Sequence, residues 1–222
     1  MNSLKVLFIG NSYTFCNKMP WIVSKFAESA QRTLVVDMVT QGGVSLEWHA
    51  NNKETLNAIE KGDWDVVVLQ DRSLGPIESR DKMHQFGMEL NEHIQEVGAE
   101  TVLYMTWARQ HIPEMIDDLA VAYISLAKKI NAKVAPVGIA WKNALDANPQ
   151  LILHTEDKSH PTPIGSYLTA CIFYSTFYNT SPEGLTGKIV IDDEKIVDLS
   201  DEDALFLQKI AWRTVLDMKK LY

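Results

Sequence analysis

The chain has 222 residues, enough for one good-sized domain, and its 46% hydrophobic and 23% charged residues are typical of an ordinary globular protein. The formal net charge is −8, and this lack of positive charge argues against nucleic acid and anionic membranes as partners. No apolar run approaches the roughly 18 residues that span a bilayer, and no signal-peptide core is visible. We therefore expect a cytoplasmic protein, or a periplasmic or secreted one if a signal peptide has been removed.

Short apolar runs rich in β-branched residues alternate with longer segments of helical period. This alternation predicts βαβ units around a mainly parallel sheet. The predicted strands are apolar on both faces, as buried parallel strands are. They cover residues 4–9, 34–40, 65–70, 101–106 and 133–137. We expect an α/β fold, specifically a three-layer α/β/α sandwich with a five-stranded sheet.

Helices are predicted between and after these strands. The clearest, residues 113–130, has three acidic residues near its N-terminus and two lysines near its end, which complements the helix dipole. The predicted helices cover residues 20–31, 53–61, 80–97, 113–130, 141–147 and 164–178. Residues 151–154 form a short apolar run whose type the pattern leaves open.

The C-terminal part predicts a peripheral hairpin and a last helix. Two apolar runs within residues 188–199 flank an Asp-rich segment, which is typical of a tight turn. Ser200 and Asp203 then form a capping-box pattern that opens a helix to about residue 220. No repeat or linker divides the chain, so we expect one domain over residues 1–222, with a core at about 4–178 and the segment 188–220 packed on it.

Cysteine and histidine spacing gives no sign of a metal site. Cys16 and Cys171 cannot form a disulfide framework or a four-ligand zinc site by themselves. The six histidines show no paired spacing such as His-x-x-x-His and do not cluster with cysteine. The sequence therefore predicts no metal and no cofactor.

Two short segments carry residues suited to nucleophilic catalysis. The first predicted strand leads into Gly10-Asn11-Ser12, at the sheet edge where ligands of open parallel sheets bind. Ser12 is a candidate nucleophile there, although Gly-Asn-Ser is also common turn and capping chemistry. Asp157 and His160 are three residues apart, so the carboxylate can orient the imidazole as a proton acceptor, or simply cap a turn beside an exposed histidine.

Together these motifs resemble the SGNH (GDSL-type) hydrolase superfamily. The resemblance rests on the Gly-Asn-Ser turn after the first strand, a Gly-Gly pair after the second, and Asp157-x-x-His160-Pro161 near the C-terminus. It spans about residues 4–178 and implies a flavodoxin-like α/β/α fold with esterase or related acyl-group chemistry. The implied roles are Ser12 as nucleophile, His160 as general base and acid, Asp157 as the group that orients His160, and the backbone N–H of Ser12 with that of Gly42 or Gly43 in the oxyanion hole.

The sequence departs from the family pattern in two places. The family usually has Asp before the nucleophile, where this chain has Asn11, a change that a turn residue tolerates. Where the family typically has Gly-x-Asn-Asp after the third strand, this chain has Leu69-Gln70-Asp71. Gln70 is the predicted substitute for the Asn side chain in the oxyanion hole, because acetylesterase branches place Gln there and its amide is the same donor. Gln70 simply ending the strand is the alternative.

Further residues are candidates for substrate contact. Trp48, Trp107 and Trp141 each follow a predicted strand, and their faces could stack on sugar rings or instead cover the core. Arg109 could anchor an acidic substrate or pair with a surface carboxylate. Asn11 lies at the same edge and is a further candidate.

The sequence thus predicts a serine esterase that forms an acyl-enzyme and hydrolyses a small acyl ester, with O-acetyl groups on a carbohydrate as the expected substrate. The expected partner is a small-molecule or carbohydrate ester, and the oligomeric state is not indicated. An acyltransferase or thioesterase on the same site is one alternative. Another is a non-catalytic flavodoxin-like module in which residues 10–14 cradle a phosphate or nucleotide.

Overall fold

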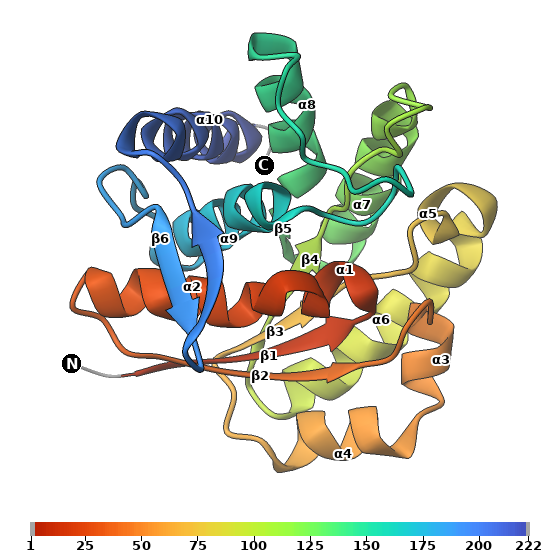
Figure 1. Cartoon of the computed structure of the whole chain (residues 1–222). Coiled ribbons are helices and arrows are strands. Elements are labelled where there is room, and N and C mark those ends of the chain that lie inside the picture. Colours follow the sequence, from red (N-terminus) through yellow and green to blue (C-terminus); the bar gives the residue numbers. More distant parts are fainter. Residues whose placement is uncertain (1–2, 221–222) are drawn as a thin grey trace.

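The computed structural model describes residues 3–220 and contains a five-stranded, all-parallel sheet of order β2-β1-β3-β4-β5 (Figure 1). The predicted parallel sheet is therefore confirmed, with strand ends shifted by at most two residues. The strands are β1 (Leu4–Gly10), β2 (Leu34–Thr40), β3 (Val66–Leu69), β4 (Glu100–Tyr104) and β5 (Lys133–Ala135).

Helices cover both faces of the sheet, because alternate side chains of each strand point to opposite faces. In β1, Val6 and Phe8 pack in one core, and Leu7 and Ile9 pack in the other. The first core is built mainly with α2 (Met19–Ser29), α8 (Val137–Ala147), α9 (Pro163–Tyr178) and α10 (Asp201–Lys219). The second is built with α3 (Leu46–Ala50), α4 (Lys53–Lys61), α6 (Arg80–Glu96) and α7 (Met115–Ile130). The predicted α/β/α sandwich is confirmed.

Several short elements differ from the prediction. The fifth strand ends at Ala135 and α8 begins at Val137, because Pro136 between them has no N–H for the ladder. Residues 151–154 form no strand and make a single bridge between His154 and Pro161. Short helices that the periodicity did not predict are α1 (Ser12–Phe15), the 3₁₀ turn η1 (Cys16–Lys18), α3 and α5 (Gly75–Glu78).

The predicted hairpin and C-terminal helix are both present. Strands β6 (Lys188–Ile191) and β7 (Glu194–Asp198) pair antiparallel, and Asp192 and Asp193 at the turn have φ of 53° and 60°, as a tight hairpin turn requires. The Ser200 hydroxyl accepts the Asp203 N–H at 3.1 Å and caps α10.

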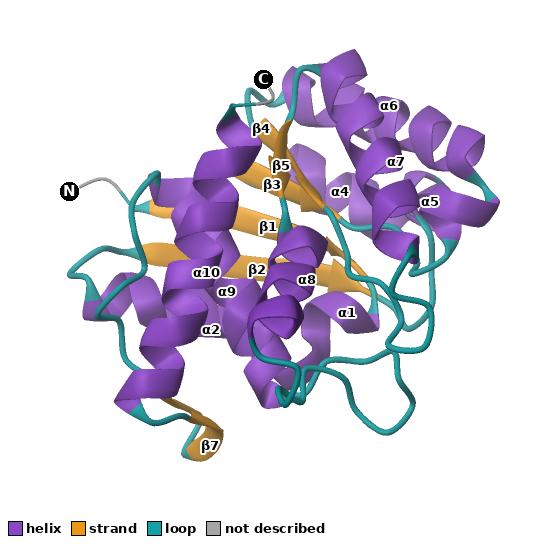
Figure 2. Ribbon diagram, turned by 90° about the horizontal axis from the view of Figure 1, so that it is seen from above, coloured by secondary structure: helices purple, strands orange, loops and turns teal. Residues whose placement is uncertain are grey.

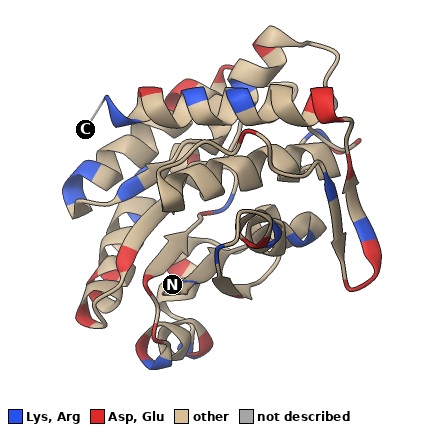
Figure 3. Ribbon diagram, turned by 90° about the vertical axis from the view of Figure 1, so that its left-hand side faces the viewer, with Lys and Arg blue, Asp and Glu red and all other residues tan. Residues whose placement is uncertain are grey.

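Positions of positively and negatively charged residues are interspersed along the outer helices and on the hairpin (Figure 3). One group of ion pairs joins the hairpin to the body of the protein, because Lys18 Nζ lies 3.1 Å from Asp192 and 3.2 Å from Glu194. Such exposed pairs contribute little stability individually. The hairpin is held mainly by Ile189, Ile191 and Val197, whose buried side chains pack in the first core.

The loops after the strands gather at one edge of the sheet, beside α1 and α8 (Figure 2). This is the carboxyl edge, where open α/β sheets bind ligands. The loops that follow β1, β2, β3 and β4 are therefore where a functional site is expected. Within residues 3–220, none of the helices has both the length and the apolar character that crossing a membrane requires.

Candidate active site

The chain turns sharply between β1 and α1 and presents Ser12 at the edge of the sheet. Gly10 ends the strand, and a Cβ there would lie 2.5 Å from Gln70 Oε1 and from Thr14 Oγ1, so a larger residue would displace these two side chains. Ser12 is the first residue of α1, where a backbone N–H has no acceptor within the helix. The turn thus places both the hydroxyl and the N–H of Ser12 at the carboxyl edge.

Asn11 ties this turn to the two neighbouring loops. Its Oδ1 accepts the Tyr13 N–H at 3.2 Å and caps α1, while its Nδ2 donates to the Val44 carbonyl at 2.9 Å and the Asp71 carbonyl at 3.4 Å. The side chain is buried. The predicted substrate contact of Asn11 is therefore wrong for this structure, because its polar atoms are engaged in joining the loops after β1, β2 and β3.

Ser12, His160 and Asp157 lie in line, although about two thirds of the chain length separates Ser12 from the other two residues. Ser12 Oγ is 2.8 Å from His160 Nε2, and His160 Nδ1 is hydrogen-bonded to Asp157 Oδ2. An ionised carboxylate can only accept, so Nδ1 carries the proton and Nε2 is left as the acceptor for the Ser12 hydroxyl. This is the arrangement in which a serine hydroxyl can lose its proton to histidine.

Asp157 is held by its own loop. Its Oδ1 accepts the backbone N–H groups of Ser159 and His160 and the hydroxyl of Thr155, each at 2.8 Å. The bond with the His160 ring is the main cause that lowers the pKa of Asp157 well below its usual range, and the other donors lower the pKa further. Asp157 is therefore charged at neutral pH, as a group that orients an imidazole must be.

A stack of three aromatic rings supports the histidine loop. Tyr13 lies parallel to Trp107 with 4.4 Å between ring centroids, and Trp107 lies parallel to Trp141 at 4.0 Å. Trp107 Nε1 donates to the Ser159 carbonyl at 2.9 Å, and the Tyr13 hydroxyl is 2.6 Å from Ser159 Oγ. The stack therefore fixes the position of the residue that directly precedes His160.

This burial corrects the expectation that three tryptophans contact substrate. Trp107 and Trp141 are each only 1% exposed, so their faces pack on other rings and are closed to a sugar. Trp48 on α3 is 38% exposed and stays a candidate for substrate contact. The prediction failed for the first two because a strand-end position does not reveal which neighbouring helix covers it.

Gln70 is buried against the nucleophile turn. Its Oε1 accepts the Asn11 N–H at 2.9 Å and the Thr14 hydroxyl at 3.0 Å, and its Nε2 is bonded to the Asp71 carbonyl. The side chain is completely buried. In this structure the amide fastens the nucleophile turn to the end of β3, so the hydrogen bonds of Gln70 do not support the predicted donation to an oxyanion.

Gly42 and Gly43 form an exposed turn after β2, close to the nucleophile turn. Gly43 has φ of +73°, which favours glycine, and space around both residues is open. The carbonyl of the next residue, Val44, accepts the Asn11 side chain. The two glycines that the sequence predicted for the oxyanion hole are therefore held beside the turn that carries Ser12.

Arg109 occupies the loop between β4 and α7. Its Nη2 donates to Ser73 Oγ at 3.4 Å, in the loop after β3. No carboxylate among residues 3–220 lies within 4.0 Å of its guanidinium, so the alternative of a surface ion pair is wrong for this structure.

Sequence reasoning missed His49, which supports the nucleophile turn from behind. His49 is fully buried, with Nε2 3.0 Å from the Gly10 carbonyl and Nδ1 2.9 Å from Thr55 Oγ1. Because the carbonyl can only accept, Nε2 carries a proton and Nδ1 accepts from Thr55. Burial lowers the pKa of His49 to about 4, which keeps it neutral at physiological pH. Its partner lies 39 positions away, so no local spacing could indicate this bond.

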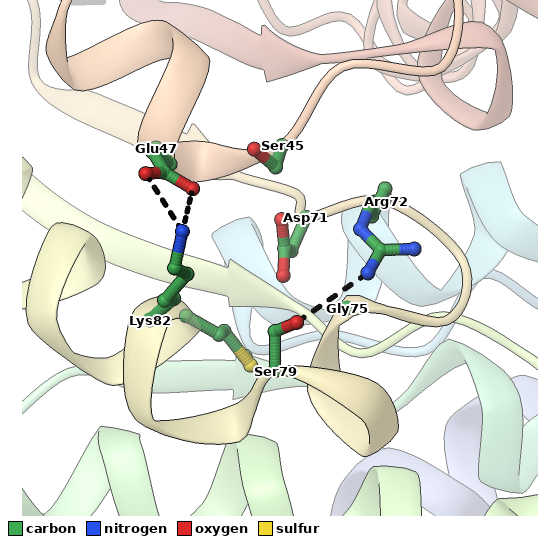
Figure 4. A pocket seen from close by; sticks show the side chains of 8 residues that line it. Ser45, Glu47, Asp71, Arg72, Gly75, Ser79 and Lys82 are labelled. Carbon is green, nitrogen blue, oxygen red and sulfur yellow. Dashed lines mark hydrogen bonds and ion pairs between the residues drawn. The ribbon is translucent and has the colours of Figure 1, made fainter.

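A polar cavity of about 200 Å³ adjoins the loop after β3 (Figure 4). Lys82 reaches across it to Glu47, and Arg72 donates to Ser79. The buried Asp71 carboxylate accepts the Leu46 N–H at 2.9 Å at the start of α3. The charged groups of this cavity are thus occupied mostly with one another.

Neither the cysteines nor the acidic residues form a second reactive centre in the part of the chain that the structure describes. No group of three or more His, Cys, Asp or Glu side chains that could hold a metal ion occurs among residues 3–220. Cys16 and Cys171 are free thiols, and burial raises the pKa of both. A raised pKa keeps a thiol protonated and unreactive at neutral pH.

Comparison with solved structures identifies the fold. A candidate SGNH hydrolase from Slackia heliotrinireducens is 28% identical, covers 79% of this chain and all of its own, and superimposes with a TM-score of 0.67. A DUF4886 family protein from Bacteroides uniformis is 20% identical with a TM-score of 0.82, covering 97% of this chain and 95% of its own. A variant of an acetyl-xylooligosaccharide esterase from Geobacillus is 15% identical with a TM-score of 0.61, covering 79% and 94%. No protein-family model and no curated protein matches the sequence.

Proposed function

We propose, on the premise that the chain has the SGNH-type hydrolase fold, that it is a serine esterase with Ser12 as its nucleophile. The observation that carries the proposal is the 2.8 Å contact between Ser12 Oγ and His160 Nε2, with Asp157 bonded to the other ring nitrogen. The neighbours of this fold include hydrolases of ester bonds, which agrees with the chemistry that the three side chains can perform.

The geometry supports a two-step reaction. Ser12 Oγ attacks the ester carbonyl carbon while His160 Nε2 accepts its proton, and the imidazolium is stabilised by the Asp157 carboxylate. The tetrahedral intermediate collapses when His160 returns the proton to the departing alcohol oxygen. Water then attacks the acyl-enzyme with His160 again acting as base, and the acid and free Ser12 are released.

Backbone N–H groups are the proposed donors to the oxyanion. The Ser12 N–H at the start of α1 has no helical acceptor, and the Gly42–Gly43 turn is held next to it through Asn11 and Val44. Gln70 takes no part, because its amide is buried and bonded to backbone. The oxyanion hole of this chain is then made mostly or wholly by backbone, and its geometry depends on how the loops are fastened.

We propose a small acyl ester as substrate, with O-acetyl groups on a carbohydrate as the first class to test. The acetyl-xylooligosaccharide esterase among the structural neighbours supports this choice. The partly exposed Trp48 at the carboxyl edge offers a face for a sugar ring.

Hydrolysis of p-nitrophenyl acetate, butyrate and octanoate by the wild type and a Ser12→Ala variant tests the proposal. We expect the acetate to be the best substrate and the variant to lose roughly 10⁴-fold or more in kcat, since the nucleophile is removed. Ser125→Ala, a serine on α7 remote from the turn, serves as the matched control. Equal activity of Ser12→Ala and the wild type would overturn the proposal.

A further inference from the structure

The loop that carries Arg109 is fixed against the loop that carries the proposed catalytic base. On one side of it, Trp107 Nε1 donates to the Ser159 carbonyl at 2.9 Å, and His154 Nε2 is 2.9 Å from the Ala108 carbonyl. On the other side, the Gln110 N–H donates to the Lys158 carbonyl at 3.0 Å. The backbone of Arg109 is thus held at three points beside residues 154–160, which fixes the position from which its side chain extends.

The guanidinium extends from this loop to the loop after β3. Arg109 Nη2 contacts Ser73 Oγ in the loop after β3, and β3 lies between β4 and β1 in the sheet. The Tyr13 hydroxyl, on the residue next to Ser12, is close to the Ser73 hydroxyl. Burial raises the pKa of Tyr13, while Ser159, Ser73 and the positive charge of Arg109 act in the opposite direction. The positive charge of Arg109 therefore acts on Tyr13, the residue next to Ser12.

The charge of Arg109 has no counter-ion in the described part of the chain. Arg72 pairs with Glu78 at 2.9 Å and Arg80 with Asp118 at 3.7 Å, but no carboxylate lies within 4.0 Å of Arg109. Its Nε is buried and has no acceptor, and the one guanidinium hydrogen bond is the 3.4 Å contact with Ser73. Burying a donor of a charged group without a partner is costly, and proteins rarely retain such a group unless something else pairs with it.

The nearby carboxylates are committed elsewhere. Asp157 is bonded to His160 and to three further donors, and Asp146, which lines the same cavity as Arg109, pairs with Lys142. A rearrangement that paired either carboxylate with Arg109 would break these bonds. The group that matches an unpaired, planar guanidinium best is a carboxylate from outside the protein, bound through parallel N–H donors.

We propose that Arg109 forms an anion subsite, and that the preferred substrates are esters that also carry a carboxylate. This inference rests on the proposed esterase function and narrows its substrate class. The carboxylate can belong to the acyl part or to the alcohol part, as in an O-acetylated acidic sugar. In either case it binds Arg109 while Ser12 attacks the ester carbonyl.

Two matched substrate pairs test the inference and separate its two forms. The alcohol-side pair is 4-acetoxybenzoate and 4-acetoxybenzamide, and the acyl-side pair is the mono-p-nitrophenyl esters of adipic acid and adipamic acid. Each pair exchanges a carboxylate for an uncharged carboxamide of similar size. The measured quantity is the ratio of kcat/KM within a pair, for the wild type, Arg109→Gln, Arg109→Lys and Arg72→Gln.

We expect the wild type to prefer the carboxylate in one pair by roughly 10- to 100-fold, the range for a charge-assisted bond. Arg109→Gln should bring that ratio close to unity, and Arg109→Lys should keep part of it. Arg72→Gln removes an arginine from the adjacent loop that is already paired with Glu78, so it should leave the ratio unchanged. Thermal unfolding of each variant establishes that it is folded.

Three results would overturn the inference: no preference in either pair, a preference that survives in Arg109→Gln, or an equal loss for both members of a pair. Calorimetric titration with 4-hydroxybenzoate, adipate and 4-hydroxybenzamide separates this failure from that of the proposed function. If no ester is hydrolysed but a carboxylate binds the wild type and not Arg109→Gln, the anion subsite stands and the esterase proposal falls. If neither hydrolysis nor binding occurs, both fall.

Discussion

The two sides of the candidate site are built in different ways. The nucleophile turn is buried and held by hydrogen bonds to residues 33 to 60 positions away, on the loops after β2 and β3. The Asp157–His160 pair is about half exposed, and the Asp157 carboxylate is held by bonds to residues two or three positions away. The position of Ser12 is thus a property of the whole sheet, whereas the His160 ring is oriented by a carboxylate of its own loop, and only the loop as a whole rests on distant residues, as Ser159 does on Trp107. Changes on the two sides should therefore affect stability and activity in different proportions.

The largest effect on activity without loss of stability is expected for Asp157→Asn. Asparagine presents an amide where His160 Nδ1–H needs a charged acceptor, so the imidazole loses its orientation and the imidazolium its counter-charge. We expect kcat for p-nitrophenyl acetate to fall by roughly 10²- to 10⁴-fold. The melting temperature should change by only about 2 °C, because the residue is exposed.

Glu156→Gln is the matched control for this prediction, because it removes a neighbouring exposed carboxylate of the same loop. It should leave both kcat and melting temperature near the wild-type values. A large drop in the melting temperature of Asp157→Asn would mean that this side of the site is also part of the cooperative core, and the contrast between the two sides would disappear.

On the nucleophile side, Asn11→Ala should lower stability and activity together. The variant loses the cap on α1 and the donors to Val44 and Asp71, and it leaves one buried and one partly buried carbonyl group with fewer partners. We expect a loss of about 2–3 kcal/mol in the free energy of unfolding, measured with urea. kcat should fall by roughly 10-fold or more, because the turn that carries the oxyanion donors is loosened.

Asn11→Asp sharpens this comparison. The aspartate keeps an oxygen for the Tyr13 N–H but replaces the Nδ2 donor with an acceptor facing the carbonyl oxygens of Val44 and Asp71. We expect it to be destabilised by an amount similar to Asn11→Ala. If Asn11→Asp is as stable as the wild type, the bonds that join the three loops do not matter, and capping alone explains the role of Asn11.

The same contrast explains which parts of the site could be predicted from the sequence. Asp157 and His160 interact at a separation of three residues, so their spacing indicated a pair that, together with Ser12, suited catalysis, and the βαβ pattern predicted a mainly parallel sheet. Gln70 and Asn11 were placed at the right edge but given the wrong partners, because their hydrogen bonds depend on loops that only the folded sheet brings together. Trp107 and Trp141 were misjudged for the same reason, since their burial depends on where α8 begins.

The smallest predicted effect concerns His49, which supports the nucleophile turn at the Gly10 carbonyl. Its pKa is lowered from 6.5 to about 4 in the folded protein, so between these values the unfolded chain binds more protons than the folded one. The stability that comes from neutral His49 is complete above about pH 6.5 and is lost as the pH falls toward 4. From pH 6.5 to 5.5 this loss amounts to about 1 kcal/mol.

His49→Gln tests this prediction, since the glutamine amide can still donate to the Gly10 carbonyl but does not titrate. Urea unfolding of the wild type should lose stability faster than the variant as the pH falls from 6.5 to 4.5. His93→Gln, which removes a partly exposed histidine on α6, is the matched control. Parallel slopes for wild type and His49→Gln would contradict the prediction, because they would mean that His49 becomes charged within the folded protein. The turn that presents Ser12 would then tolerate a charged side chain behind Gly10, although the burial of His49 argues against this.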